Sequence, residues 1–346
     1  MRILVVKTTS LGDIIHTLPA LTDAKRHFKT FSVDWVVEEP FSEVPLWHSS
    51  VQRIIPIALR RWRKTPWNIQ KCKEISVFMK AVRQEKYDYV IDAQGLLKSA
   101  AVTILCCAKK RIGLSWHSAR EALASLFYNK RAVVPWGQHA VTRARALFAK
   151  GLGYPLPETE PDYGIDTTRL PALSFALPKP YYVFLHGTTW ATKHWPESYW
   201  CELAKTVDAA GQHVLLLWGN EAELARANRI ADQLSKALVV PNKLTLSEAM
   251  RVLAESRGIV TVDTGLGHLA AALGVPTVSL FGPSDPKNSG TLGQNQTNLS
   301  AAFPCAPCHQ RACSIIGEKS IDPPCFASLP AQLIWEQLQR QVAEAK

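Results

Sequence analysis

The chain has 346 residues, of which 47% are hydrophobic and 20% charged, a composition typical of a globular protein of two domains. No apolar run approaches the roughly 18 residues of a membrane-spanning helix. The apolar residues before Lys7 are too few for the core of a signal peptide. We therefore expect a cytoplasmic protein whose eight cysteines are reduced.

The net charge of +11 is unevenly distributed along the chain. Residues 1–150 hold 25 Lys and Arg against 11 Asp and Glu, or +14, and residues 151–346 hold 15 against 18, or −3. The two halves should therefore meet different partners, with an anionic one on the N-terminal side. Nucleic acid, an anionic membrane face and a phosphorylated substrate all fit.

The first predicted element is a buried strand, Arg2 to Val6, followed by a polar loop and an apolar helical pattern. Pro19 falls inside the pattern and predicts a kink or a restart of the helix. The loop has one glycine and no Gly-Lys-Ser/Thr, so it is neither a dinucleotide fingerprint nor a Walker loop. Asp13, at the start of the helix, is either a cap or a general base that faces a cleft between domains.

Strands are next predicted at Ser32 to Val37 and Arg53 to Ile57, and the densest basic cluster follows at residues 60–67, Arg-Arg-Trp-Arg-Lys-Thr-Pro-Trp. This cluster is either a solvated loop or a binding surface. Interleaved Trp and Arg suit a lipid headgroup boundary, an anionic sugar or a nucleic-acid groove. A further strand, Tyr87 to Ala93, ends on the sheet edge of Asp13, where Lys98 either meets an anionic acceptor or covers a helix face.

The second domain is predicted to begin with a strand, Tyr181 to Leu185, whose following loop carries Thr188, Thr189 and Lys193. Two hydroxyl donors and one compact cation in that place suit a diphosphate. The strand Val214 to Leu217 is followed by Glu223, and a carboxylate there commonly binds a ribose hydroxyl pair.

A βαβ unit follows, with strands Ile259 to Val262 and Thr277 to Phe281 joined by a helix that Gly274 ends. The loop after its first strand holds Asp263, Thr264 and Gly265. Ligands of open α/β sheets bind at such strand ends, and a glycine at a helix N-terminus suits a phosphate or a polyol held by Asp263. The same residues also suit a simple helix cap.

The predicted fold is α/β, with two Rossmann-like domains that face a central cleft. The first domain spans residues 1–153, a proline-rich linker 154–179 and the second domain 180–328, and a helix over 329–346 packs back on the first domain. Four cysteines near the end, one CxxC and two at uneven distances, are a candidate zinc site that lacks a second CxxC: Cys305, Cys308, Cys313 and Cys325.

Six segments taken together resemble the bacterial lipopolysaccharide heptosyltransferases (glycosyltransferase family 9), and heptosyltransferase I most closely. They are Lys7–Asp13, His16–Asp23, Arg60–Lys64, Asp92–Ala100, Lys193–Pro196 and Val262–Leu273. The resemblance implies a GT-B fold, the donor ADP-L-glycero-β-D-manno-heptose and a Kdo-lipid A acceptor. It also implies a peripheral enzyme on the cytoplasmic face of the inner membrane, with no cofactor or metal required.

The resemblance also implies a role for each candidate residue. Asp13 is the base of one inverting displacement. The donor-binding residues are Thr188, Thr189, Lys193, Glu223, Leu244, Asp263, Thr264, Gly265 and His268. The acceptor-binding residues are Thr9, Ser10, Arg60, Arg61, Arg63, Lys64 and Lys98.

Three other functions compete with this one. Heptosyltransferase II adds the second heptose, and the cysteine cluster resembles some of its sequences. A GT-B nucleotide-sugar epimerase would act without an acceptor. A basic nucleic-acid-binding protein would explain the first half of the chain, but no nucleic-acid motif accompanies the charge, so we expect no nucleic-acid partner.

Overall fold

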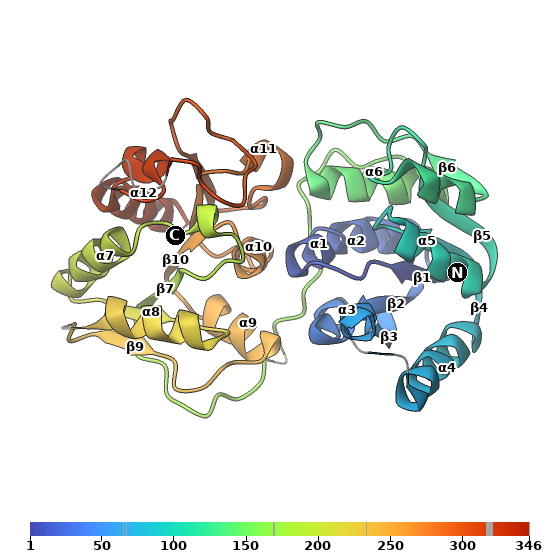
Figure 1. Ribbon diagram of the computed structural model, residues 1–346, viewed down its shortest axis with the longest axis horizontal. Helices are drawn as coiled ribbons and strands as arrows, with labels where there is room; N and C mark the ends of the chain where they lie inside the picture. Colours follow the sequence, from blue (N-terminus) through green and yellow to red (C-terminus); the bar gives the residue numbers. More distant parts are fainter. Residues whose placement is uncertain (65, 67, 169, 233, 316–320, 346) are drawn as a thin grey trace. The chain divides into compact units, whose positions relative to one another are not determined.

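The computed structural model describes residues 1–64, 66, 68–168, 170–232, 234–315 and 321–345. The chain divides into two units, Met1–Asp166 and Thr167–Lys346. Each unit is a six-stranded parallel sheet with helices packed against it (Figure 1). The predicted α/β fold with two Rossmann-like sheets is confirmed.

Unit 1 has the strand order β3-β2-β1-β4-β5-β6. Its strands are β1 Arg2–Val6, β2 Ser32–Glu38, β3 Val51–Ile57, β4 Lys86–Asp92, β5 Cys107–Leu114 and β6 Lys130–Ala132. Its helices are α1 Leu11–Ile15, α2 Leu18–His27, α3 Leu59–Lys64, α4 Ile69–Arg83, α5 Leu97–Leu105 and α6 Ala140–Leu152, with 3₁₀ helices η1 Glu39–Phe41, η2 Val44–Trp47 and η3 Ala122–Phe127. The helical pattern after β1 does restart, because Pro19 lies in the first turn of α2, where its missing N–H costs nothing.

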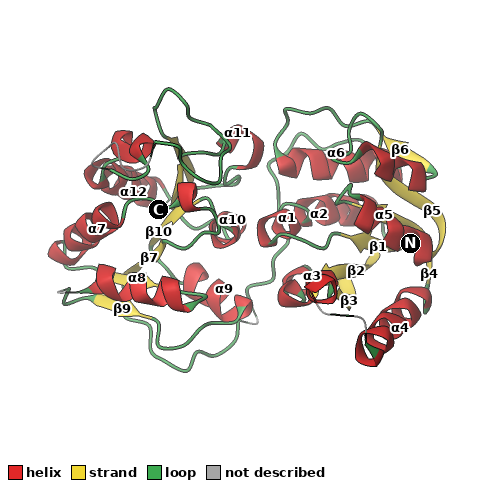
Figure 2. Cartoon of the chain, viewed as in Figure 1, coloured by secondary structure: helices red, strands yellow, loops and turns green. Residues whose placement is uncertain are grey.

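Unit 2 has the strand order β12-β11-β10-β7-β8-β9. Its strands are β7 Tyr181–Leu185, β8 His213–Leu216, β9 Ala237–Val239, β10 Gly258–Val262, β11 Thr277–Phe281 and β12 Gln296–Ser300. Its helices are α7 Glu197–Ala209, α8 Glu221–Ala231, α9 Leu246–Ala254, α10 Gly265–Ala272, α11 Pro286–Ser289 and α12 Ala331–Glu344, with 3₁₀ helices η4 Ala191–Lys193 and η5 Pro324–Ser328. Most of the segment between β12 and η5 is loop (Figure 2).

Both sheets follow one plan, since the order of each, counted within its unit, is 3-2-1-4-5-6. In such a sheet the strand order reverses between the first and fourth strands, and ligands bind outside the carboxyl ends of these two. The plan therefore directs attention to the loops after β1 and β4 in unit 1 and after β7 and β10 in unit 2.

The first part of the stretch predicted as a linker packs against unit 1. Tyr154 and Tyr163 are buried, Arg145 donates to the carbonyl of Thr159 at 2.8 Å, and Ile165 forms a β-bridge with His48. Residues 154–166 thus belong to unit 1, and the division falls between Asp166 and Thr167. Proline content suggested a linker, but the two buried aromatic rings anchor this segment.

The C-terminal helix, α12, packs within unit 2. Its apolar residues Ile334, Leu338 and Val342 are buried in the core of unit 2, against α7, β10 and β11. Among the described helices, none combines the length and apolar character that crossing a bilayer requires.

Candidate active site

Asp13 lies in the first turn of α1, just past the end of the central strand β1. Its carboxylate accepts hydrogen bonds from the Ser10 backbone N–H at 2.7 Å and from the Ser10 hydroxyl at 3.0 Å, so it is part of the helix cap. The side chain is nevertheless 44% exposed, and the Lys7 ammonium lies 3.6 Å from its other oxygen. Asp13 is therefore a capping residue that solvent reaches.

The loop that carries Asp13 is fastened to the end of β4 by two residues that the sequence reasoning missed. The side-chain oxygen of Gln94 accepts the backbone N–H groups of Thr8 at 3.1 Å and Thr9 at 3.3 Å. The Lys7 ammonium donates to the carbonyl of Ala93 at 3.1 Å. These contacts join the two loops that flank the reversal point of the sheet.

Asp92, the last residue of β4, anchors this arrangement from inside. It is fully buried and accepts hydrogen bonds from the Ser99 hydroxyl at 2.8 Å and the Tyr128 hydroxyl at 2.7 Å. Burial raises the pKa of its carboxyl, and the hydrogen bonds to it act in the opposite direction. Asp92 is a structural support, since no substrate reaches it.

Residues 60–64 of the basic cluster lie in helix α3, and their side chains have different surroundings. Arg61 forms ion pairs with Glu39 at 2.9 Å and Glu74 at 2.8 Å. Trp62 is half-buried, and its indole N–H donates to Glu74 at 2.7 Å. Within the part of the chain that the structure describes, the exposed Arg63 and Lys64 have no acidic partner. Residue 67, the second tryptophan of the cluster, lies outside the described residues.

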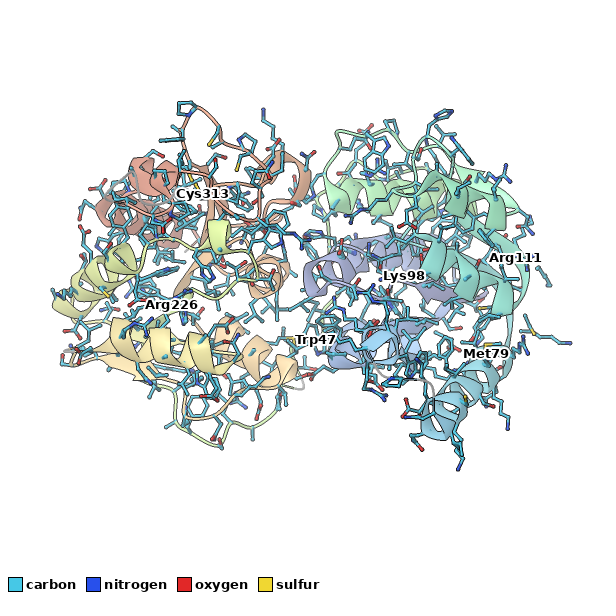
Figure 3. All side chains as sticks on the ribbon, in the orientation of Figure 1. Trp47, Met79, Lys98, Arg111, Arg226 and Cys313 are labelled. Atoms are coloured by element: carbon cyan, nitrogen blue, oxygen red, sulfur yellow. The ribbon has the colours of Figure 1, made fainter. Side chains whose placement is uncertain are left out.

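Lys98 and Arg60 both lie close enough to the buried Glu38 for their charges to act on its carboxyl. The Arg60 backbone N–H donates to Glu38 at 3.2 Å. Burial raises the pKa of Glu38, while the Arg60 hydrogen bond and the charges of Arg60 and Lys98 oppose that rise. Lys98 lies in the first turn of α5, and its side chain is exposed (Figure 3). The structure thus brings Lys98 together with the basic cluster at the carboxyl edge of the sheet.

In unit 2, Asp263 is the centre of a compact polar group after β10. Its carboxylate accepts from the Lys193 ammonium and the Ser284 hydroxyl, both at 2.6 Å, and His268 lies 3.8 Å away. Its backbone carbonyl accepts the Thr188 hydroxyl at 3.1 Å. The loops after β7, β10 and β11 therefore meet at one carboxylate. Ser284 was not predicted, although it directly follows the strand Thr277 to Phe281.

Lys193 is positioned from two sides. Its ammonium lies 4.4 Å from the centre of the Trp190 ring, and Arg311 lies 5.1 Å from the same ring. The Thr192 hydroxyl donates to the carbonyl of Gln310 at 2.6 Å, so the loop after β12 supports the loop after β7. An ammonium has three donors, and Lys193 can keep one on Asp263 while another meets a phosphate oxygen. Thr189 is exposed beside it.

A pocket of about 200 Å³ opens at the same edge of unit 2. Glu223 lines it and accepts the backbone N–H of Gly219 at 2.7 Å. Gly187 lies against this side chain, and a Cβ at that position would lie 2.7 Å from the Glu223 carboxyl and displace it. The predicted Leu244 and Thr264 line the pocket with Lys243 and Trp218, and Gly265 begins α10 with the free amides of a helix N-terminus. An apolar pocket with one carboxylate suits a nucleoside.

The cysteine candidate is not supported as a metal site. Among the residues that the structure describes, no three potential ligands of the His, Cys, Asp or Glu type are gathered closely enough to hold an ion. Burial, followed by the neighbouring thiols of Cys305, Cys308 and Cys313, raises the pKa of Cys325 to about 11. The loop holding Cys313 belongs to unit 2 (Figure 3).

Two sheets of the Rossmann type, with a pocket and a lysine at the carboxyl edge of the second, are the architecture of a glycosyltransferase of the GT-B fold. The sequence model of glycosyltransferase family 9 (heptosyltransferase) matches residues 75–317. The chain belongs to this family.

Relatives and solved structures agree. The chain is 51% identical to lipopolysaccharide heptosyltransferase 1 of Pseudomonas aeruginosa, over 98% of this chain and 97% of that protein. It is 47% identical to the Escherichia coli K12 heptosyltransferase 1, over 86% and 92%. The structure of E. coli heptosyltransferase WaaC with ADP superposes with a TM-score of 0.87 at 42% identity, over 99% and 100% of the two chains. These findings make the chain an enzyme of heptose transfer in lipopolysaccharide core synthesis.

Proposed function

We propose that the enzyme transfers L-glycero-D-manno-heptose from ADP-heptose to the Kdo residue of Kdo-lipid A. The observation that carries the proposal is the group formed by Lys193, Asp263 and Ser284 beside the Glu223 pocket. Such a site holds a nucleotide by its nucleoside, a diphosphate by its charge and a sugar by a carboxylate. Support comes from the similar structure of E. coli WaaC with ADP-2-deoxy-2-fluoro heptose, at a TM-score of 0.83 and 41% identity.

The first heptose is favoured over the second. A heptosyltransferase 2 of Salmonella typhimurium is 32% identical over 40% of this chain, against 51% over 98% for the heptosyltransferase 1 of P. aeruginosa. An epimerase would need no acceptor and leaves the exposed Arg63 and Lys64 without a role. Membership of family 9 also removes the reason to propose a nucleic-acid-binding protein.

In the proposed reaction the Kdo hydroxyl attacks the anomeric carbon of the heptose as the bond from that carbon to the ADP oxygen breaks. Asp13 takes the hydroxyl proton, which suits its exposed carboxylate. Lys193 and the amides at the start of α10 compensate the charge that grows on the diphosphate, with Thr188 and Thr189 as hydroxyl donors. Glu223 binds the ribose, Asp263 the heptose hydroxyls, and His268 supports the diphosphate end. These residues supply the charge compensation without a metal.

The acceptor is anionic, and unit 1 offers the cations to bind it. Arg60, Arg63, Lys64 and Lys98 bind the Kdo carboxylate and lipid phosphates, and Thr9 and Ser10 orient the sugar beside Asp13. Arg61 contributes less than the other arginines, because Glu39 and Glu74 already neutralise it. We place the enzyme on the cytoplasmic face of the inner membrane as a peripheral protein.

The first experiment incubates the purified protein with ADP-heptose and Kdo-lipid A and follows the acceptor by mass spectrometry. One added heptose is expected. Consumption of the nucleotide sugar in the absence of acceptor would instead indicate an epimerase.

We predict that Asp13→Asn lowers kcat by on the order of a hundredfold or more while the Kd for ADP-heptose changes less than about twofold. Asparagine keeps an oxygen for the Ser10 cap but cannot accept the proton at neutral pH. Calorimetry measures donor binding and single-turnover kinetics measures transfer. Because the cap is kept, an unchanged melting temperature is expected, and unchanged turnover would remove Asp13 from the role of base.

A further inference from the structure

In the parts of the chain that the structure describes, large exposed apolar side chains occur in unit 1 and not in unit 2. All eleven exposed residues of this kind in the described parts of the chain lie between Leu46 and Leu156, within unit 1. Seven of them fall between Leu97 and Trp136. An exposed apolar area confined in this way marks an interaction surface and not the scattered residues of an ordinary exterior.

The longer segment that contains these seven residues is strongly cationic. Residues 93–157 hold ten Lys and Arg and a single acidic residue, Glu121. Glu121 is engaged locally, because its carboxylate accepts the backbone N–H of Leu97 at 2.7 Å. Lys98 and Arg120 are exposed among the apolar residues.

Hydrogen bonds join these residues into one surface at the carboxyl ends of β4, β5 and β6. The Glu121 backbone N–H donates to the carbonyl of Gly95 at 3.2 Å, which ties the segment after β5 to the start of α5. The Trp136 indole N–H donates to the carbonyl of His117 at 2.7 Å, which ties the segment after β6 to the segment after β5. Trp116 and Trp136 are 44% and 59% exposed. Tryptophan side chains are usually buried unless the surface that carries them binds another molecule.

The 3₁₀ helix η3 adds two leucines. Leu123 and Leu126 are three residues apart, so they project on the same side of a 3₁₀ helix, and they are 52% and 61% exposed. Their neighbours Ala124 and Tyr128 are buried against Ala100 of α5, which fixes the outward direction of the leucines.

We propose that this docking surface, made of Leu97, Trp116, Leu123, Leu126 and Trp136 with Lys98 and Arg120, binds the anionic face of a lipid bilayer. Tryptophans settle at the headgroup level, leucines reach the acyl boundary, and lysine and arginine attract anionic lipids. The docking surface, which includes Lys98, lies at the carboxyl edge of the unit 1 sheet, the edge that also carries the Asp13 loop. A lipid acceptor could therefore stay in the bilayer while its sugar reaches the base, and this last point rests on the proposed function.

The test is cosedimentation of the full-length protein with vesicles of phosphatidylcholine, with or without about 30% phosphatidylglycerol. The double variant Leu123→Ser/Leu126→Ser should bind the anionic vesicles about tenfold more weakly than the wild type. The matched control is Ile69→Ser/Val77→Ser on α4, which removes two apolar residues that are 75% and 66% exposed elsewhere on unit 1 and should bind normally. Circular dichroism confirms that both variants are folded.

A second arm measures transfer of heptose. On a deacylated, water-soluble Kdo acceptor the two double variants should match the wild type. On the full lipid acceptor in anionic vesicles, only Leu123→Ser/Leu126→Ser should be slower, by about tenfold. If the wild type transfers nothing to the soluble acceptor, the proposed function fails, whereas the vesicle result still tests the surface.

Three results would overturn the docking surface. One is equal vesicle binding by the wild type and Leu123→Ser/Leu126→Ser. Another is binding that does not respond to phosphatidylglycerol. The third is a change of oligomeric state in that variant with vesicle binding intact, which would assign the leucines to a contact between copies of the chain.

Discussion

Asp263 collects contacts from residues far apart in the chain, and this makes it the most constrained charge of the candidate site. Its side chain is 9% exposed and that of Lys193 is 16% exposed. Removing one member of such a pair leaves the other charge with little solvent and no counterion, which costs more than the pair itself contributes.

We therefore predict that Asp263→Asn lowers the free energy of unfolding by about 2 kcal/mol and weakens ADP-heptose binding. Urea unfolding and calorimetry measure the two effects. Arg26→Gln is the matched control, because Arg26 and Asp162 form an exposed pair whose loss should cost about 0.5 kcal/mol or less. Equal stability losses in the two variants would contradict the argument from burial.

The residues of the candidate site were predictable to different degrees. Asp13, Lys193 and Asp263 could be found because each is a charged residue that comes shortly after a recognisable buried strand. Gln94 and Ser284 could not, because their contacts depend on tertiary structure. Gln94 meets Thr8 across 86 positions, and Ser284 meets Asp263 across 21.

Among elements, the central strands were predictable, whereas three strands toward the sheet edges, β5, β6 and β12, were not. β1, β7, β10 and β11 are almost entirely buried and mostly apolar, with serine or threonine only in β10 and β11, the pattern of a parallel strand covered on both faces. β5 carries Lys109, Lys110 and Arg111 (Figure 3) and is partly exposed, while β6 has only three residues and β12 is mostly polar. Hydrophobic periodicity therefore gives no signal for these strands near the sheet edges.

The segment between η2 and β3 contains a histidine that makes unit 1 sensitive to acid. The Nδ1 atom of His48 accepts the Ser50 backbone N–H at 3.1 Å, and its Nε2 atom lies 3.0 Å from the Thr22 hydroxyl. Burial, aided by the charge of Lys25, lowers the pKa of His48 from 6.5 to about 4. The folded chain thus keeps the neutral ring, while the unfolded chain binds the proton.

From this shift we predict that the stability His48 contributes is complete above about pH 6.5 and is lost as the pH falls toward about 4. The loss between about pH 7 and about pH 4.5 should be about 2 kcal/mol from this residue. Urea unfolding at the two pH values measures it. His48→Gln should flatten the dependence, and a substitution of the exposed His27 by Gln should leave it unchanged.

At the scale of the whole molecule, residues 1–150 carry a net charge of +14 and residues 151–346 a net charge of −3. From this contrast we expect the two substrates to respond differently to salt. The acceptor should depend on long-range attraction to unit 1. The donor should depend on the short, partly buried contacts of Lys193, which salt screens less.

Raising the salt from about 0.05 M to about 0.5 M should therefore increase the KM for a soluble anionic acceptor several-fold, and the KM for ADP-heptose by much less. Initial rates with one substrate saturating separate the two constants. An equal increase in both would mean that the charge of residues 1–150 does not serve acceptor capture.

The two hydrogen bonds that Gln94 accepts from Thr8 and Thr9 have a consequence for the loops that they join. One amide side chain sets the spacing between the loop that bears the proposed base and the loop that leads to Lys98. Asparagine at this position would be one methylene too short to hold both backbone groups at their present distances. We therefore expect a substitution at Gln94 to alter the reaction at the acceptor while every proposed contact with substrate is kept.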